Sequence, residues 1–297
     1  MKVVVGCDGG GTKCHVRVAI IEGNSVQRFA DAITGPANFK ADANLAIENI
    51  KTAIQCASEA AGVEDESIDI LVAALAGTGL REAQAACENR LSAELNVARV
   101  VVVPDAAVLF AAANIQGMAI ATVIGTGSIA WARDARGNVH RAGGLGPDIG
   151  DEGSGFWIGR ECIRNLKDHA LGELVEQHVP GLEDDESSYA LPENRHRVAA
   201  FAAVAFCIQE PNKLFESILN RAANHIADLI QTAVAEMGPS EISPIPWICA
   251  GGVAVNQPRW IESIRQICHN HEVLLTQPTT VRDPVRGAVA MAIDLLH

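Results

Sequence analysis

Apolar residues along this chain follow two spacings, one typical of strands and one typical of helices. Short apolar runs that end in polar residues or glycine predict buried strands, and they lie at 4–7, 68–75, 100–103, 118–124 and 244–249. Apolar residues three and four positions apart predict helices instead, and these stretches lie at 41–61, at 80–95, over much of 153–237 and at 281–296. Strands that alternate with helices indicate an α/β fold with a mainly parallel sheet.

Two of the predicted strands end in the same kind of turn. Residues 4–14 read VVGCDGGGTKC and residues 118–128 read MAIATVIGTGS, so each apolar run leads into glycines and a threonine. Each turn is followed by further extended residues, which predicts a strand, a tight turn and a second strand. Glycine lets backbone N–H groups approach a ligand closely, and such groups can hold phosphate oxygens. An ordinary glycine-rich hairpin is the alternative. Two such hairpins predict a duplicated fold whose halves hold one polyphosphate, with the boundary near residue 116.

Two commoner nucleotide motifs do not fit. Residues 125–130 satisfy the dinucleotide pattern G-x-G-x-x-G/A, but that motif needs a helix at the turn. The chain instead reaches another turn, DARGN at 134–138, after a few extended residues. The phosphate-binding pattern G-x-x-x-x-G-K-[ST] is absent from the sequence.

Composition and charge exclude several classes of partner. The 297 residues are 48% hydrophobic and carry a formal net charge of −13, and no Lys/Arg cluster forms a basic stripe. We therefore expect binding neither to nucleic acid nor to an anionic membrane. Eight cysteines lie mostly in apolar runs without a C-x-x-C pair, and no signal peptide or long apolar span is evident. These features predict a soluble cytoplasmic protein with reduced thiols.

Three groups of residues are candidates for chemistry. Asp8 precedes the first glycine turn, where a carboxylate suits a divalent cation or its water shell. Asp105 follows a strand and starts a helix, which fits either a general base or a helix N-cap. Residues 143–159, GGLGPDIGDEGSGFWIG, form a glycine-rich loop ahead of a helix. Its acids, Asp148, Asp151 and Glu152, suit sugar hydroxyls or a metal, and an acidic capping turn is the alternative.

These motifs together resemble the superfamily of sugar kinases, acetate kinase, heat-shock ATPases and actin, and within it the N-acetylglucosamine kinase family. The resemblance spans nearly the whole chain, and residues 143–158 are its most specific part. It implies that Asp105 is the catalytic base and that Asp8 holds hydrated Mg²⁺. It also implies ATP contacts, at Gly10, Gly11, Thr12, Lys13, Gly125, Thr126, Gly127, Gly251 and Gly252, and amino-sugar contacts, at Asn38, Asp105, Gly144, Leu145, Gly146 and Asp151. Leu145 stands where mammalian-type members carry Trp, and Phe39-Lys40 replaces an aromatic-bearing stretch after Asn38.

The resemblance predicts duplicated ribonuclease H-like domains, as in actin-like ATPases, each with a mainly parallel mixed sheet. The N-terminal lobe would be 1–116, joined by the helix at 285–297, and the C-terminal lobe would be 117–284. The implied reaction is ATP-dependent phosphorylation of N-acetyl-D-glucosamine at its 6-hydroxyl, in a homodimer. The alternatives are a glucosamine or N-acetylmuramate kinase, an ATPase that activates a radical dehydratase or benzoyl-CoA reductase, and a non-catalytic sugar-sensing regulator. The sequence does not rank Asp148 against Asp151 as a sugar ligand.

Overall fold

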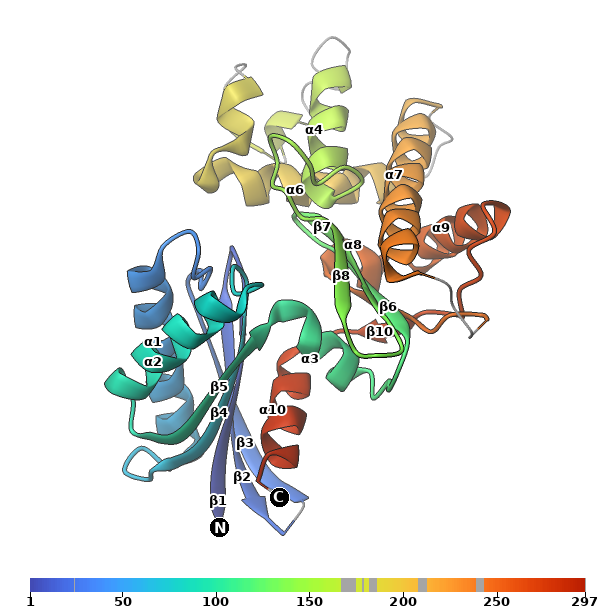
Figure 1. The fold of residues 1–297 in the computed structure, drawn as a ribbon. Coiled ribbons are helices and arrows are strands. Elements are labelled where there is room, and N and C mark those ends of the chain that lie inside the picture. Colours follow the sequence, from blue (N-terminus) through green and yellow to red (C-terminus); the bar gives the residue numbers. More distant parts are fainter. Residues whose placement is uncertain are drawn as a thin grey trace. The chain divides into compact units, whose positions relative to one another are not determined.

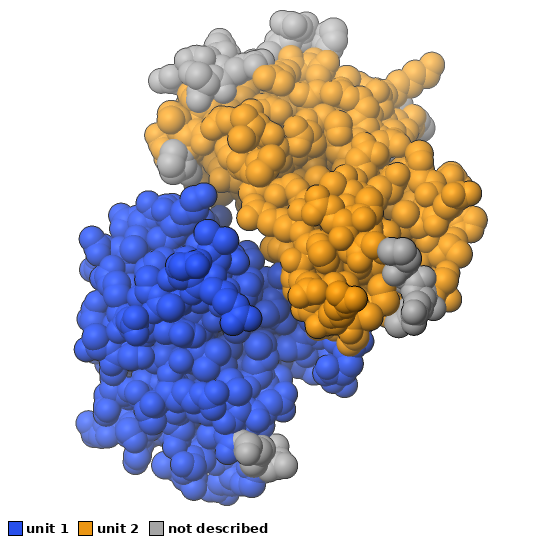
Figure 2. Space-filling model, in the orientation of Figure 1, with its two compact units in different colours: residues 1–116, 283–297 blue, residues 117–282 orange. Residues whose placement is uncertain are grey.

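The chain forms two compact units (Figures 1 and 2). The computed structural model describes residues 1–23, 25–166, 175–177, 179–181, 186–207, 213–238 and 243–296. Unit 1 comprises residues 1–116 and 283–297, and unit 2 comprises residues 117–282. The chain therefore passes between the units twice, after Gln116 and after Arg282.

Unit 1 is built on a five-stranded mixed sheet in the order β3-β2-β1-β4-β5. Its strands are β1 (Lys2–Gly9), β2 (Cys14–Glu22), β3 (Ser25–Thr34), β4 (Ile68–Leu75) and β5 (Val97–Pro104). β1 pairs antiparallel with β2 and parallel with β4, so the tip of the β1–β2 hairpin lies at the same edge as the carboxyl ends of β4 and β5. That edge is where open α/β sheets gather ligands.

Helices cover both faces of the unit 1 sheet (Figure 1). They are α1 (Ala43–Ala61), α2 (Arg81–Glu94), α3 (Asp105–Ala112) and α10 (Val285–Asp294). Alternate residues of β1 face different cores, since Val3 and Val5 pack with α1 whereas Val4 packs with α3 and α10. The near-continuous apolar strands of this sheet are explained by burial on both faces.

Helix α1 shows how local sequence sets the limits of an element. Its N-cap Asp42 accepts hydrogen bonds from the backbone N–H groups of Asn44 and Leu45, both at 3.0 Å. The helix ends at Gly62, whose φ of 64° lies in the left-handed region that glycine adopts without strain. Between these caps the helix buries one apolar face, which includes Ile47, Ile50 and Ile54.

Unit 2 repeats the sheet with a different helical cover. Its strand order is β10-β9-β6-β7-β8, with strands β6 (Ala119–Ile124), β7 (Ser128–Arg133), β8 (Val139–Gly143), β9 (Trp247–Ala250) and β10 (Thr279–Val281). Its described helices are α4 (Gly155–Leu166), the 3-10 helix η1 (Glu186–Ala190), α6 (Pro192–Cys207), α7 (Lys213–Met237), α8 (Gly252–Asn256) and α9 (Pro258–Asn270). Residues from all the α-helices of this unit join the sheet in one large apolar core.

The sheets confirm the predicted α/β architecture of two lobes with mixed sheets, but neither sheet is mainly parallel as predicted. In each sheet two pairings are parallel and two are antiparallel. Both predicted strand–turn–strand segments are present, as β1–β2 and β6–β7. Within the described residues no helix is both long and apolar enough to cross a bilayer.

Two predicted boundaries were wrong. The apolar pattern at 281–296 starts too early for the last helix, because residues 279–281 form β10 beside β9; the helix begins at Val285, the start of the predicted range 285–297, with Pro284 as its N-cap. The strand predicted at 244–249 is β9, which begins at Trp247. Pro244 and Pro246 have no N–H to donate to a sheet ladder, so the segment before Trp247 does not continue the strand.

Candidate functional site

The first glycine turn of unit 1 is closed by a short backbone hydrogen bond and is open at its tip. The N–H of Gly10 donates to the carbonyl of Lys13 at 2.9 Å, which closes the β1–β2 hairpin. A Cβ on Gly9 would lie 2.5 Å from Leu75 Cδ2, so the base of the turn is packed tightly. A Cβ on Gly11 would meet nothing within 4 Å, and Thr12 and Lys13 are exposed. The tip therefore leaves backbone N–H groups accessible to a ligand.

Carboxylates gather beside this turn. Asp8 lies at the end of β1, and burial raises its pKa to about 6, with a further rise from the negative charges of Asp105 and Asp283 and an opposing effect of Lys13. Asp283 is held by Arg17, whose Nη1 donates to its Oδ2 at 2.8 Å. Three carboxylates thus lie close to one edge of the sheet. They come from the end of β1 (Asp8), the start of α3 (Asp105) and the segment just before α10 (Asp283).

Asp105 occupies the first position of α3. The strict N-cap interpretation of this residue was wrong, because the cap is Pro104, which makes no side-chain capping bond. One carboxylate oxygen of Asp105 accepts from the N–H of Ala106 at 3.1 Å, and the side chain is partly exposed. The negative charge of Asp105 acts on Asp8, which places Asp105 near the first glycine turn, and a carboxylate within hydrogen-bond reach of a hydroxyl can act as a general base.

Asn38 lies on a loop that packs against the turn after β4. The Phe39 N–H donates to the carbonyl of Ala76 at 3.1 Å, and Asn38 Oδ1 accepts from the N–H groups of Lys40 and Ala41 at 3.1 and 3.2 Å. Gly77 has a φ of 86°, and a Cβ there would lie 2.7 Å from Asn38 Oδ1.

The turn after β4, residues 76–79, was not predicted from the sequence. Buried Thr78 braces it by donating to the carbonyl of Leu75 at 2.7 Å. The signal was present as the run AGTG directly after an apolar strand, the same order that marked the two predicted phosphate turns.

The second glycine turn, in unit 2, is tied to the start of α4. The Gly125 N–H donates to the carbonyl of Gly127 at 3.0 Å, which closes the β6–β7 hairpin. The N–H groups of Gly155 and Phe156 donate to the carbonyls of Gly125 and Thr126 at 2.8 and 3.2 Å. This turn is therefore fixed by the helix that follows the glycine-rich loop.

Asp151 is the buried acid of the glycine-rich loop, with only 4% of its surface exposed. Its Oδ1 accepts from the Ser128 N–H at 3.2 Å, and its Oδ2 accepts from Arg195 Nη2 at 2.8 Å. A Cβ on Gly127 would lie 2.8 Å from Asp151 Oδ1, so only glycine fits there. Asp148 is exposed, whereas Asp151 is buried and bonded to the second turn.

The rest of the predicted sugar loop is open to solvent. Leu145 and Ile149 expose 62% and 74% of their surfaces. Gly144 and Gly146 have φ values of 68° and 94°, which only glycine adopts readily, and the Gly144 N–H donates to the carbonyl of Ser128 at 2.9 Å. The loop is therefore anchored at Gly144 and presents apolar side chains beyond it.

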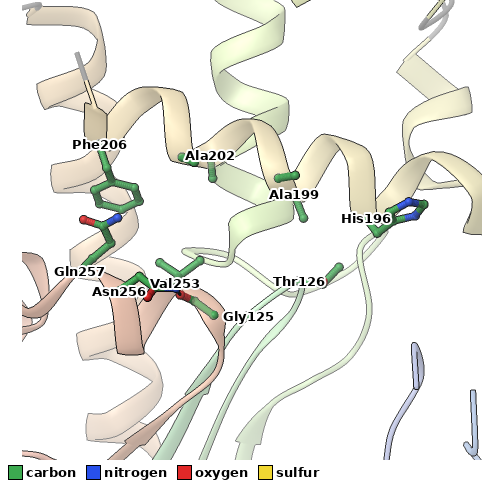
Figure 3. A pocket seen from close by; sticks show the side chains of 12 residues that line it. Gly125, Thr126, His196, Ala199, Ala202, Phe206, Val253, Asn256 and Gln257 are labelled. Carbon is green, nitrogen blue, oxygen red and sulfur yellow. Dashed lines mark hydrogen bonds between the residues drawn. The ribbon is translucent and has the colours of Figure 1, made fainter. Parts of the chain in front are cut away.

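A cavity of about 470 Å³ in unit 2 brings the second turn and the late glycine pair together (Figure 3). Gly125, Thr126 and Gly252 line it, although about 125 residues separate them along the chain. The opposite wall is helix α6, and the remaining lining comes from α8 and the residue after it. The lining residues are Gly125, Thr126, His196, Ala199, Ala200, Ala202, Ala203, Phe206, Gly252, Val253, Asn256 and Gln257.

The α6 wall was missed by the sequence analysis. Four alanines leave room for a ligand, and Phe206 provides an aromatic surface at the side of the cavity opposite His196 in Figure 3. Phe206 is braced by an edge contact with Trp260, at 5.6 Å between ring centroids. The clustering of small residues in AAFAAVAF, residues 199–206, was the available signal.

The two glycines of the late motif have different surroundings. A Cβ on Gly251 would lie 2.5 Å from the carbonyl oxygen of Ile124, and its φ is 92°. A Cβ on Gly252 would meet nothing within 4 Å. Gly251 therefore allows β9 and α8 to approach the second turn, whereas Gly252 leaves open space in the cavity.

The donor set for a metal is sparse. Among the residues that the structure describes, no three His, Cys, Asp or Glu side chains converge to hold an ion directly. Mg²⁺ dehydrates reluctantly and is commonly bound by one or two carboxylates together with substrate phosphates and waters. Asp8 is the residue that could hold it.

Comparison with known proteins identifies the family of this chain. The model of the BadF/BadG/BcrA/BcrD ATPase family matches residues 5–292. The chain belongs to this family. The match includes both glycine turns, the glycine-rich loop and α10. It confirms the predicted membership of the sugar-kinase and actin-like ATPase superfamily.

Two curated relatives of this chain are named as kinases. The chain is 30% identical over 168 residues to the N-acetylmuramic acid/N-acetylglucosamine kinase of Clostridium acetobutylicum, and the match covers 55% of this chain and 53% of that protein. It is 24% identical over 318 aligned positions to the N-acetyl-D-glucosamine kinase of Dictyostelium discoideum, which covers 99% and 98% of the two chains. A solved structure of a candidate N-acetylglucosamine kinase from Porphyromonas gingivalis shares the fold, with a TM-score of 0.74 at 22% identity over the full length of both chains.

Proposed function

We propose that this protein transfers the γ-phosphoryl group of ATP to an amino sugar, N-acetyl-D-glucosamine, and forms N-acetyl-D-glucosamine 6-phosphate. One observation carries the proposal. Residues of two predicted nucleotide motifs, Gly125 and Thr126 of the second turn and Gly252 of the late glycine pair, line a single cavity of about 470 Å³, large enough for a ligand of nucleotide size. Membership of an ATPase family and the names of the relatives support the same reaction.

The cavity offers suitable surfaces to each part of a nucleotide. Phe206 provides an aromatic wall for the base, and the amides of Asn256 and Gln257 can hydrogen-bond polar edges. Asn256 Nδ2 already donates to the carbonyl of Gly252 at 2.8 Å, which orients its amide. The turn at Gly125, Thr126 and Gly127 would then hold the phosphates, and in unit 1 the turn at Gly10, Gly11, Thr12 and Lys13 would do the same.

Asp105 would act on the acceptor. In phosphoryl transfer the protein mainly positions the reactants and neutralises the charge on the phosphates. It also needs one acidic residue that orients or deprotonates the attacking hydroxyl. We assign that proton to a carboxylate oxygen of Asp105. Asp8 would hold the hydrated Mg²⁺, which neutralises phosphate charge when it is bound.

The sugar contacts are assigned to two loops. Asn38 in unit 1, together with Gly144, Leu145, Gly146 and Asp151 in unit 2, would bind the amino sugar. The exposed Leu145 offers an apolar surface that suits the methyl group of an acetamido substituent better than a charged amine. This favours N-acetyl-D-glucosamine over glucosamine, whereas N-acetylmuramate keeps the same acetamido group.

A substrate panel tests the proposal. Sugar-dependent release of ADP should be measured with N-acetyl-D-glucosamine, glucosamine, N-acetylmuramate and glucose, each with ATP and Mg²⁺. We expect the highest kcat/KM with N-acetyl-D-glucosamine. A preference for N-acetylmuramate or glucosamine would change the substrate, and ATP hydrolysis that no sugar stimulates would favour an ATPase activator instead. Such activators bridge an iron–sulphur cluster with cysteines, and the two exposed cysteines here, Cys56 and Cys207, lie in different units.

Replacement of Asp8 by Asn should stabilise the protein while it impairs Mg²⁺-dependent activity. Burial raises the pKa of Asp8 from 3.8 to about 6, which corresponds to roughly 3 kcal/mol against the ionised form in the native state. Because the native pKa is the higher one, this destabilisation is absent below about pH 4 and complete above about pH 6. Thermal unfolding without Mg²⁺ should therefore show a higher Tm for Asp8→Asn at pH 7.5 and an equal Tm near pH 3.5.

The exposed Asp65 provides the matched control for this substitution. Asp65→Asn removes the same charge from unit 1 without removing a buried carboxylate, so its Tm should follow that of the unaltered protein at both pH values. A lower Tm for Asp8→Asn at pH 7.5 would show that its carboxylate is stabilised in the native state and would contradict the prediction.

A further inference from the structure

Helix α6 contributes to both halves of the unit 2 site. His196, Ala199 and Phe206 face the nucleotide cavity from this helix (Figure 3). Arg195, the residue before His196, reaches the glycine-rich loop and binds Asp151. One helix therefore carries residues of the cavity and the partner of a proposed sugar ligand.

The contacts around Asp151 are short and specific. Arg195 Nη2 lies 2.8 Å from Asp151 Oδ2, and the Ser128 N–H lies 3.2 Å from Oδ1. The Ser154 N–H donates to the Asp151 carbonyl at 3.1 Å, and Ser128 Oγ donates to the carbonyl of Glu152 at 2.8 Å. Asp151 has a φ of 62°, unusual for a residue that is not glycine. The surroundings thus hold Asp151 in one orientation between the second turn and α6.

The environment of the Asp151 carboxylate makes Arg195 important for its charge. Burial raises the pKa of Asp151, and the nearby Glu152 raises it further, whereas the Ser128 N–H and Arg195 oppose the rise. Arg195 is the one cation among the groups that shift the pKa of Asp151. The Asp151 carboxylate is buried whereas Arg195 is one-third exposed (34%), so removal of Arg195 leaves a buried carboxylate without its cation and leaves Oδ2 without this hydrogen bond.

We propose that Arg195 is a positioning residue that couples the two substrates of this site. Arg195 holds Asp151 in the orientation in which its remaining lone pairs can accept a hydrogen bond from a sugar hydroxyl. A nucleotide that packs against α6 fixes that helix, so it also fixes Arg195 and lowers the entropy lost when the sugar binds. The inference rests on the proposed function and adds a cooperative link between nucleotide and sugar that passes through one ion pair.

Calorimetry on the full-length chain tests this link. The affinity for N-acetyl-D-glucosamine should be measured with and without saturating Mg²⁺ and a non-hydrolysable ATP analogue. For the unaltered protein we expect the analogue to tighten sugar binding about fivefold or more, within the usual range of coupling between sites. Arg195→Met keeps the aliphatic stem but removes the charge, and we expect this coupling factor to fall to within twofold of unity. Arg195→Lys, which retains a cation, should recover part of it.

Arg197 on the same helix provides the matched control. It donates to Asn194 Oδ1 at 3.1 Å and to the carbonyl of Pro180, and among the described residues it makes no hydrogen bond or ion pair with the glycine-rich loop. Arg197→Met should therefore keep the full coupling factor, with thermal unfolding as the check on folding for every variant.

The outcomes separate this inference from the proposed function. Independent binding of the two ligands to the unaltered protein, or full coupling in Arg195→Met, overturns the inference and leaves the proposed function intact. Absence of nucleotide binding to the unaltered protein overturns both. If Arg195→Met does not fold, Arg195→Lys decides: a coupling factor below that of the unaltered protein supports the inference, and a coupling factor equal to that of the unaltered protein overturns it.

Discussion

Asp105→Asn is expected to lower kcat by about 10³-fold or more and to leave nucleotide affinity within about twofold of the unaltered protein. General base catalysis by one side chain typically contributes 10²- to 10⁴-fold, and the amide of Asn cannot take the proton of the sugar hydroxyl. The cavity that we assign to the nucleotide lies in unit 2 and is not lined by Asp105, so the substitution should not change it. Steady-state kinetics gives kcat, and calorimetry with an ATP analogue gives the affinity.

The control for Asp105→Asn is Asp65→Asn, which removes an exposed acid from the same unit. We expect its kcat to match that of the unaltered protein. Activity of Asp105→Asn within tenfold of that protein would remove Asp105 from the role of base, whereas loss of nucleotide binding in this variant would show that its effect reaches beyond the acceptor.

The second large effect is expected at the late glycine pair, where Gly251→Ala and Gly252→Ala should behave differently. Alanine at Gly251 would place a Cβ 2.5 Å from the Ile124 carbonyl oxygen, at a φ of 92°. We expect a loss of at least about 2 kcal/mol of stability from strain and overpacking. Because the displaced Ile124 directly precedes the second turn, nucleotide affinity should also fall by about tenfold or more.

Alanine at Gly252 meets no atom within 4 Å. The free energy of unfolding of Gly252→Ala should therefore stay within about 0.5 kcal/mol of that of the unaltered protein. The added methyl group should nevertheless occupy cavity space and weaken nucleotide binding. Thermal unfolding and calorimetry measure both quantities on both variants. Equal stability of the two variants would contradict the assigned role of Gly251, and unchanged nucleotide affinity in Gly252→Ala would place the nucleotide outside this cavity.

The parts of the fold that the sequence could predict are those with a strong local signal. The apolar run at Ile68–Leu75 is β4 with the same limits, and residues 41–61 contain α1 between Asp42 and Gly62. The two glycine turns could be recognised because several glycines follow an apolar run, and at Gly9 the close packing against Leu75 leaves no room for a Cβ. Element limits failed where pairing partners decide them, as for β10 beside β9.

The parts of the site that could not be predicted depend on contacts between distant segments. Nothing near Arg195 indicates that it binds Asp151, 44 residues earlier. The α6 wall of the cavity is likewise defined only when Thr126 and Gly252 lie opposite it. Burial of Asp8 and its proximity to Asp283 also arise from tertiary structure, and they set a pKa that composition does not reveal. Dimer formation and cytoplasmic location stay predictions.

The most direct test of the central claim identifies the chemical position of the transferred phosphoryl group. The protein should be incubated with ATP, Mg²⁺ and N-acetyl-D-glucosamine, and the products followed by proton-coupled ³¹P nuclear magnetic resonance. We predict a new phosphomonoester signal split into a triplet by the two protons on carbon 6, in an amount equal to the ADP formed. Inorganic phosphate as the only new product, or a doublet from a phosphate on carbon 1, would contradict the account.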